Sequence, residues 1–220
     1  MITSIISRDI DEKRFSVLDF YERRVRRIFP ALFVVGVSAI AVGVLVLTPI
    51  RLKDFSQSVA ATALFTSNFL FWKESGYFAR VSETKPLLHT WSLSVEEQFY
   101  IVFPLMLWLL KTHFRSRLLA SVWFLTIVSF VANLVSTANS PAAAFFLPFG
   151  RGWELLLGSL LALGAFAGPK SRSANQVLAT IGFALILWSV AFYSIRTPFP
   201  GVAALPPLSR CRAADHDRRA

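Results

Sequence analysis

Cysteines and charged side chains are both scarce in this 220-residue sequence. Cys211 is the single cysteine, which excludes a disulfide framework within the chain. Charged residues make up 16%, against about 25% in typical soluble proteins, while 55% of residues are hydrophobic and the mean hydropathy is +0.55. A domain of this size leaves too much surface exposed to hide that apolar surplus in a core. The composition therefore excludes an ordinary soluble domain and indicates a protein that lies in lipid.

Acidic residues are also few: 13 Asp and Glu stand against 23 Lys and Arg, a net charge of +10. A soluble protein with this excess would be a candidate for nucleic-acid binding. Here the Lys and Arg residues lie between apolar runs instead of on one soluble face, a pattern typical of cytoplasmic loops and contact with anionic lipid. We therefore expect the bilayer as a partner and no nucleic acid.

Long apolar runs predict an all-α, multi-pass transmembrane helix bundle. A helix needs about twenty apolar residues to cross a hydrocarbon core roughly 30 Å thick. The second run is shorter and polar enough that it spans only if it is tilted or the bilayer is thinned. About six spans are predicted, at residues 31–50, 57–72, 94–110, 118–135, 153–167 and 177–195.

An arginine cluster precedes the first run. Arg23, Arg24, Arg26 and Arg27 stand in the segment FYERRVRRIF, directly before the apolar residues. One interpretation is a positive-inside anchor at the membrane surface. The other is an anion site, because Arg24 and Arg27 are three residues apart and share a helix face, so both guanidinium groups could reach one phosphate.

The segment PLLHTWSLSVEEQFYIVFP at 86–104 places His89, Glu96, Glu97 and Gln98 at the mouth of a predicted span. Carboxylates are costly in hydrocarbon and usually mark a polar cavity, a partner charge or a functional site. A helix that begins near Ser92 or Ser94 explains Glu96 as an acid in the first turn, but it explains Glu97 and Gln98 less well. His89 is interpreted either as a loop histidine or as a base.

A third group of polar residues lies at the start of the fifth apolar run. In RGWE, Arg151 and Glu154 are three residues apart, so they can form an ion pair on one helix. The alternative is that Glu154 faces the arginine cluster across a cavity in the bundle.

Four blocks in this order resemble the acyltransferase 3 family: FYERRVRRIFPAL, SNFLFW, the 86–104 segment and FFLPFGRGWELLLGSLLA. The resemblance covers about 2–205. It implies bacterial O-acetylases of the cytoplasmic (inner) membrane with about ten spans. These enzymes transfer an acyl group, typically acetyl from acetyl-CoA, to a hydroxyl of lipopolysaccharide, other surface polysaccharide or peptidoglycan.

By the same resemblance, Arg24 and Arg27 handle the acyl donor, and Glu97 and Arg151 occupy family motif positions. Deprotonation of an alcohol needs a base, usually histidine. The family's histidine lies in a first span that this chain lacks, so the catalytic residue stays unassigned. The candidates are Glu97, Arg151, Glu154 and His89. Acyl-CoA is expected as a co-substrate, and no bound cofactor or metal is expected.

The resemblance further predicts three segments: a basic, amphipathic cytoplasmic segment at 1–29, a partial acyltransferase membrane domain at 30–205, and an atypical tail at 206–220 where LSRCRAADHDRRA exchanges apolar residues for charged ones. The chain is expected to be a fragment that is inactive alone. The alternative is a noncatalytic membrane protein, either transporter-like or an assembly partner.

Two interpretations are possible for the side of the membrane on which each loop lies. Strict alternation from a cytoplasmic arginine cluster places the 86–104 segment and RGWE on the cytoplasmic side. Charge bias favours the inverse for the later loops, because Lys111, Arg115 and Arg117 would otherwise lie outside.

Overall fold

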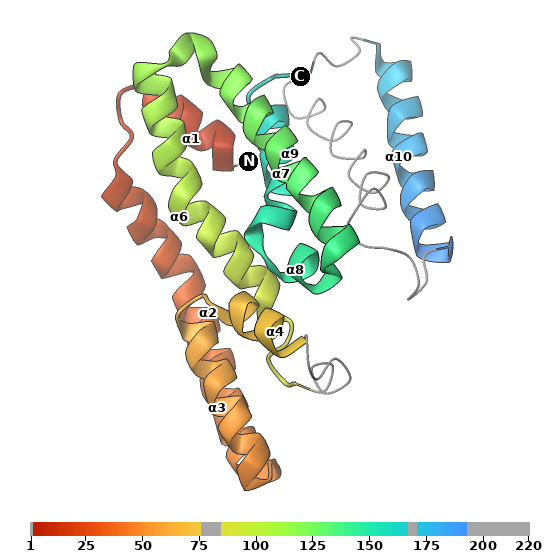
Figure 1. Ribbon diagram of the computed structural model, residues 1–220. Helices are drawn as coiled ribbons and strands as arrows, with labels where there is room; N and C mark the ends of the chain where they lie inside the picture. Colours follow the sequence, from red (N-terminus) through yellow and green to blue (C-terminus); the bar gives the residue numbers. More distant parts are fainter. Residues whose placement is uncertain (1, 76–84, 167–170, 193–220) are drawn as a thin grey trace. The chain divides into compact units, whose positions relative to one another are not determined.

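The computed structural model describes residues 2–75, 85–166 and 171–192. Every regular element in these ranges is a helix, which confirms the all-α prediction. The α-helices are α1 (Ile2–Asp11), α2 (Val17–Val46), α3 (Pro49–Ala63), α4 (Ser67–Ser75), α6 (Thr90–His113), α7 (Leu118–Asn139), α8 (Pro141–Phe146), α9 (Pro148–Ala162) and α10 (Arg172–Phe192), and a 3-10 turn, η1 (Arg115–Arg117), precedes α7 (Figure 1).

The chain forms two compact units. The first, called the α2–α4 unit, contains Asp9–Met106 and Phe146–Pro148. The second, called the α7–α9 unit, contains Leu107–Phe145 and the described residues of 2–8 and 149–192. The helix α6 contributes its first part to one unit and its last part to the other.

Four helices in the described residues are long and apolar enough to cross a membrane: Val17–Val46, Thr90–His113, Arg115–Asn139 and Ser173–Phe192. The count of about six spans is therefore not confirmed. In α2, Ser16 caps the N-terminus by accepting a hydrogen bond from the backbone N–H of Asp19. This helix runs without interruption from the arginine cluster through Pro30 to Val46, four residues short of the end of the span predicted at 31–50.

The prediction of one span at 57–72 is wrong. The helix α3 ends at Ala63 and α4 begins at Ser67, so the run contains a break. Phe65 lies in the break with φ +53°, a backbone conformation that a bulky residue rarely adopts. Apolar composition alone did not indicate this break, because the groups that stabilise it come from α6.

The span predicted at 153–167 also differs. The helix α9 begins earlier, at Pro148, and ends at Ala162. Gly164 follows with φ +77°, and the N–H groups of Gly164 and Ala165 bond to the carbonyls of Leu161 and Leu160, which closes the helix end. The helix therefore has 15 residues. The last three residues of the run predicted at 177–195 and the whole predicted tail at 206–220 lie outside the described residues.

Within the α2–α4 unit, α3 folds back beside α2 (Figure 1). Leu47 ends α2 and Thr48 leads into Pro49, the first residue of α3, where proline is well tolerated. The Phe55 ring packs on Gly43, and a Cβ at Gly43 would lie 2.8 Å from that ring. A small residue at 43 therefore allows the two helices to approach closely.

Candidate functional site

The centre of the α2–α4 unit is an ion pair between Arg24 on α2 and Glu97 on α6. Arg24 Nε donates to Glu97 Oε2 at 2.8 Å, and Nη2 donates to Oε1 at 2.6 Å. The Arg24 side chain is 13% exposed and that of Glu97 is 8% exposed. A bidentate pair of this kind fixes the orientation of both planar groups. The pair therefore joins two candidate residues that are 73 positions apart in the sequence.

Two tyrosines complete the contact between α2 and α6. The Arg24 guanidinium lies 3.5 Å from the centre of the Tyr100 ring, a close cation–π contact. The Tyr21 hydroxyl donates to the carbonyl of Ile101 at 2.5 Å. Sequence reasoning missed both tyrosines. The available signal was spacing, since Tyr100 follows Glu97 by three residues and Tyr21 precedes Arg24 by three, which places each pair on one helix face.

A cavity of about 100 Å³ adjoins this ion pair. Its polar lining comes from Arg24, Glu97 and the two tyrosines, and the rest is apolar: Val25, Ile28, Phe29, Phe65 and Ile101. A water molecule occupies about 30 Å³ in the liquid. The cavity thus has room for a small group such as an acetyl group.

The other arginines of the cluster have different surroundings. Arg23 and Arg27 are exposed and lie four residues apart, one turn of α2. Arg26 pairs with Glu22 at 2.6 Å, with the two side chains 78% and 58% exposed. That Arg24 and Arg27 bind one phosphate together remains a prediction. What the structure adds is that the Arg24 fork is occupied by Glu97, whereas Arg27 faces outward.

Gln98 serves the break between α3 and α4. Its Nε2 donates to the carbonyl of Phe65 at 2.7 Å and to Asn68 Oδ1 at 2.9 Å. Asn68 is fully buried and donates in turn to the carbonyl of Phe146 at 3.3 Å. The side chain of Gln98 thus satisfies a backbone carbonyl that the interrupted helix leaves open.

Replacing Gln98 by leucine is expected to destabilise the α2–α4 unit by about 1–3 kcal/mol, because the Phe65 carbonyl and the Asn68 amide lose their partner in a buried site. Thermal unfolding of the detergent-solubilised chain measures the effect. The neighbouring Glu96→Gln, at an exposed position of the same helix, is the control. An unchanged midpoint for Gln98→Leu would show that the break does not depend on this side chain.

Hydroxyl groups link α3 and α4 to the start of α6. The hydroxyl oxygens of Ser67 and Ser94 are 2.7 Å apart, and those of Thr62 and Thr90 are 2.9 Å apart. The Thr90 hydroxyl also donates a hydrogen bond to the Ser67 hydroxyl at 3.1 Å. All four residues are buried. The expectation that α6 begins near Ser92 or Ser94 is corrected: it begins at Thr90, and the Ser94 hydroxyl is used between helices instead of at a helix end.

His89 and Glu96 lie outside the ion pair. His89 is exposed just before α6, and its backbone carbonyl accepts a hydrogen bond from the Ser92 hydroxyl at 3.2 Å. Glu96 is exposed on α6. In the described residues, neither side chain forms a hydrogen bond or an ion pair with Arg24 or Glu97.

In the α7–α9 unit, Arg151 Nη1 lies 3.6 Å from Glu154 Oε2, the pair that their spacing allows. The Arg151 guanidinium also lies 4.8 Å from the Phe145 ring. Burial raises the pKa of the Glu154 carboxyl and lowers the pKa of the Arg151 guanidinium, and each partner's opposite charge works against that shift. The helix α9 is not among the four candidate spans.

Asn133 of α7 holds the start of α9. Its Nδ2 donates to the carbonyl of Gly150 at 2.6 Å, and Asn133 is fully buried. One turn earlier, the Ser129 hydroxyl donates to the carbonyl of Phe149 at 2.8 Å, and the Phe130 ring contacts Trp153. Sequence reasoning missed Asn133, although a single asparagine in an otherwise apolar run is a signal of a buried polar role.

Long apolar helices joined by a buried ion pair define a multi-pass helical membrane protein with a polar centre. The family model described as an acyltransferase domain matches residues 5–208, so the chain belongs to the acyltransferase 3 family. The family identification from the four sequence blocks is thereby confirmed. No solved structure matches the chain.

Three curated relatives indicate what the chain is similar to. An uncharacterized protein of Haemophilus influenzae is 32% identical over 94% of this chain and 89% of its own length. The O-acetyltransferase OatA of Staphylococcus aureus is 28% identical over 85% of this chain, and the "Putative peptidoglycan O-acetyltransferase YrhL" of Bacillus subtilis is 33% identical over 66%. The chain spans 33% of the length of OatA and 24% of YrhL.

Proposed function

We propose that this chain forms part of a membrane O-acetyltransferase that moves an acetyl group from acetyl-CoA to a hydroxyl of a cell-surface carbohydrate. The observation that carries the proposal is the buried Arg24–Glu97 pair, which lies beside a small cavity. One turn after Arg24 on α2, the Arg27 side chain is exposed. The names of OatA and YrhL support O-acetyl transfer, and the name of YrhL supports peptidoglycan as the acceptor.

The two predicted donor arginines receive different roles in this proposal. Both Glu97 oxygens accept hydrogen bonds from Arg24, so Glu97 positions Arg24 instead of acting as the base. Arg27 supplies a solvent-facing guanidinium for the phosphates of the coenzyme, and Arg23 lies one turn before it. The cavity of about 100 Å³ admits the acetyl end of the donor, which favours a short acyl chain.

Acetyl-CoA-dependent labelling of peptidoglycan in membranes that contain the chain tests this function. Transfer above the level of membranes without the chain supports the proposal and shows that the expected inactivity of the chain alone is wrong. Transfer at that background level removes the proposal that this chain catalyses the reaction. Surface polysaccharide and lipopolysaccharide, offered separately under the same conditions, identify the acceptor class.

Replacing Arg27 by glutamine is expected to raise the KM for acetyl-CoA about tenfold or more and to leave the stability of the chain unchanged, because a charged hydrogen bond to phosphate contributes about 1.5–3 kcal/mol. The matched control is Arg26→Gln on the same helix, since Arg26 is paired with Glu22. Equal KM values for the two variants would remove Arg27 from donor binding.

A further inference from the structure

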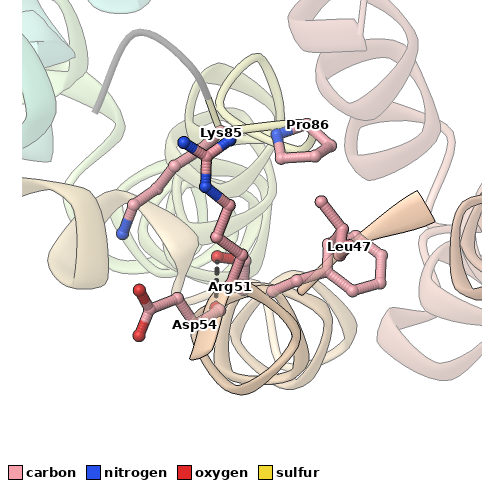
Figure 2. A pocket seen from close by; sticks show the side chains of 7 residues that line it. Leu47, Arg51, Asp54, Lys85 and Pro86 are labelled. Carbon is pink, nitrogen blue, oxygen red and sulfur yellow. Dashed lines mark hydrogen bonds between the residues drawn. The ribbon is translucent and has the colours of Figure 1, made fainter. Parts of the chain in front are cut away.

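A second cavity lies at the other end of α2, where α2 turns into α3. It has a volume of about 80 Å³, and its lining is Leu47, Arg51, Asp54, Phe55, Ser58, Lys85 and Pro86. Figure 2 shows the Arg51 side chain reaching from α3 toward Lys85 and Pro86. Both cations and the Asp54 carboxylate therefore belong to one small site within the α2–α4 unit.

The charges of this cavity are only partly satisfied. Lys85 is held in place by an ion pair with Glu74, and its side chain is 13% exposed. Arg51 and Asp54 form no ion pair with any residue that the structure describes. The site thus offers a fixed ammonium, a guanidinium and a carboxylate at one position, which suits a ligand that carries both a negative and a positive group.

An apolar groove of about 240 Å³ lies next along the same two helices. Its lining comes from three segments: Phe29, Leu32, Phe33, Val35, Gly36, Val37 and Ile40 on α2, Val59, Thr62 and Ala63 on α3, and Leu87. A Cβ placed on Gly36 would meet nothing within 4 Å, so the groove is open at this point. The hydroxyl of Thr62 is used by Thr90, which leaves an apolar wall.

The groove and the charged cavity lie at different positions along α2. Only 6% of the apolar window of α2 is buried within the chain, so most of its side chains are open to contact with lipid. The charged cavity begins at Leu47, where this apolar run ends. From Ile40 to Leu47 the helix rises about 10 Å at about 1.5 Å per residue. A charged site at the end of the apolar run thus follows an apolar groove along the same helix.

We propose that the α2–α3 hairpin binds one phospholipid molecule with an ethanolamine headgroup. Its phosphate lies between Arg51 and Lys85, its ammonium group lies at Asp54, and one acyl chain lies in the groove beside Gly36. Charge complementarity selects this occupant, because a headgroup with a phosphate alone leaves Asp54 beside like charge. Only Phe29 lines both this groove and the cavity beside Arg24 and Glu97, and no charged residue is shared, so the lipid site does not depend on the acyl-transfer proposal.

The headgroup assignment is tested by native mass spectrometry of the whole chain in detergent after exchange with vesicles of phosphatidylethanolamine or phosphatidylglycerol. Arg51→Gln is expected to reduce bound phosphatidylethanolamine about tenfold. Lys53→Gln, an exposed position on α3 that does not line the cavity, is the matched control and is expected to change it less than about twofold. Asp54→Asn is expected to abolish the preference for phosphatidylethanolamine over phosphatidylglycerol.

The tail assignment is tested separately by Gly36→Leu, which adds side-chain volume to the groove at a position where a Cβ has open space. This variant is expected to lose most of the bound lipid. Gly158→Leu is the control, because a Cβ at Gly158 on α9 also meets nothing within 4 Å and lies outside the groove. Equal lipid binding by the Gly36 and Gly158 variants overturns the tail site.

Equal binding of the two lipids, or equal loss in the Arg51 and Lys53 variants, overturns the headgroup site. Lipid binding is measured without acyl transfer, so its failure is distinguishable from failure of the proposed function.

Discussion

Replacing Glu97 by alanine is expected to abolish acyl transfer and to destabilise the chain by about 3–5 kcal/mol. The variant leaves the Arg24 guanidinium, which is 13% exposed, without the carboxylate that holds both of its donors. An uncompensated charge in a low-dielectric environment is the reason for the large effect. Thermal unfolding in detergent and transfer from acetyl-CoA measure the two consequences.

A double variant separates stability from activity. Arg24→Met combined with Glu97→Leu replaces the ion pair by apolar side chains of similar volume, which is often neutral or stabilising in a buried site. We expect this variant to unfold near the midpoint of the unmodified chain and to remain inactive, because the arginine is gone. A double variant as unstable as Glu97→Ala would contradict the view that the two charges depend on each other.

The exposed pair on the same helix is the control for this experiment. Glu22 and Arg26 also form an ion pair, but their side chains are 58% and 78% exposed. Exposed pairs contribute about 0–1 kcal/mol, since water screens both charges. Glu22→Ala is therefore expected to leave the midpoint almost unchanged. The contrast between Glu22 and Glu97 tests whether burial, and not pairing alone, determines the effect.

Much of the fold could be predicted because long apolar runs have one physical solution in lipid. The regions at 94–110 and 118–135 fall in helices long enough to span, and the region predicted at 31–50 does so as far as Val46, where α2 ends. The run at 57–72 could not be predicted correctly, because hydropathy averages over the break at Phe65. In that break the carbonyl of Phe65 accepts a hydrogen bond from Gln98, which lies 33 positions later in the sequence. A window of neighbouring residues contains no information about such a partner.

The sequence predicted which residues belong to the candidate site, but not which of them form ion pairs with one another. Carboxylates and arginines beside apolar runs are expensive, so Arg24, Glu97, Arg151 and Glu154 stood out from their types alone. Spacing favoured Arg24 with Arg27 on one face of a helix. The structure instead pairs Arg24 with Glu97 across two helices, because a bidentate contact satisfies both groups in a buried setting. Which helices meet is decided by packing over the whole unit, not by local pattern.

Replacing Gly150 by alanine is expected to destabilise the α7–α9 unit by about 1–3 kcal/mol. A Cβ at this position would lie 2.5 Å from the carbonyl oxygen of Ala144 and 3.0 Å from its Cα. These are backbone atoms of a buried residue, so they cannot rotate away as a side chain can. The loss outweighs the gain of about 1 kcal/mol that alanine brings to a helix interior relative to glycine.

The clash in Gly150→Ala is expected to move the backbone at position 150, and this movement is expected to reach the polar residues that follow it. Asn133 bonds to the Gly150 carbonyl, and Arg151 is the next residue along α9. Movement of this turn therefore displaces the Arg151–Glu154 pair together with the backbone. Circular dichroism during heating measures stability, and limited proteolysis measures whether the connection between α8 and α9 has opened.

Gly158→Ala is the matched control for this variant. Gly158 lies on the same helix, and a Cβ there meets nothing within 4 Å. Alanine at this position is expected to raise the stability by up to about 1 kcal/mol, because it reduces the conformational freedom of the unfolded chain. Opposite signs for Gly150→Ala and Gly158→Ala would establish that close approach of the Ala144 backbone, and not helix propensity, requires glycine at 150. Equal stabilisation by both substitutions would show that the start of α9 has room for a side chain.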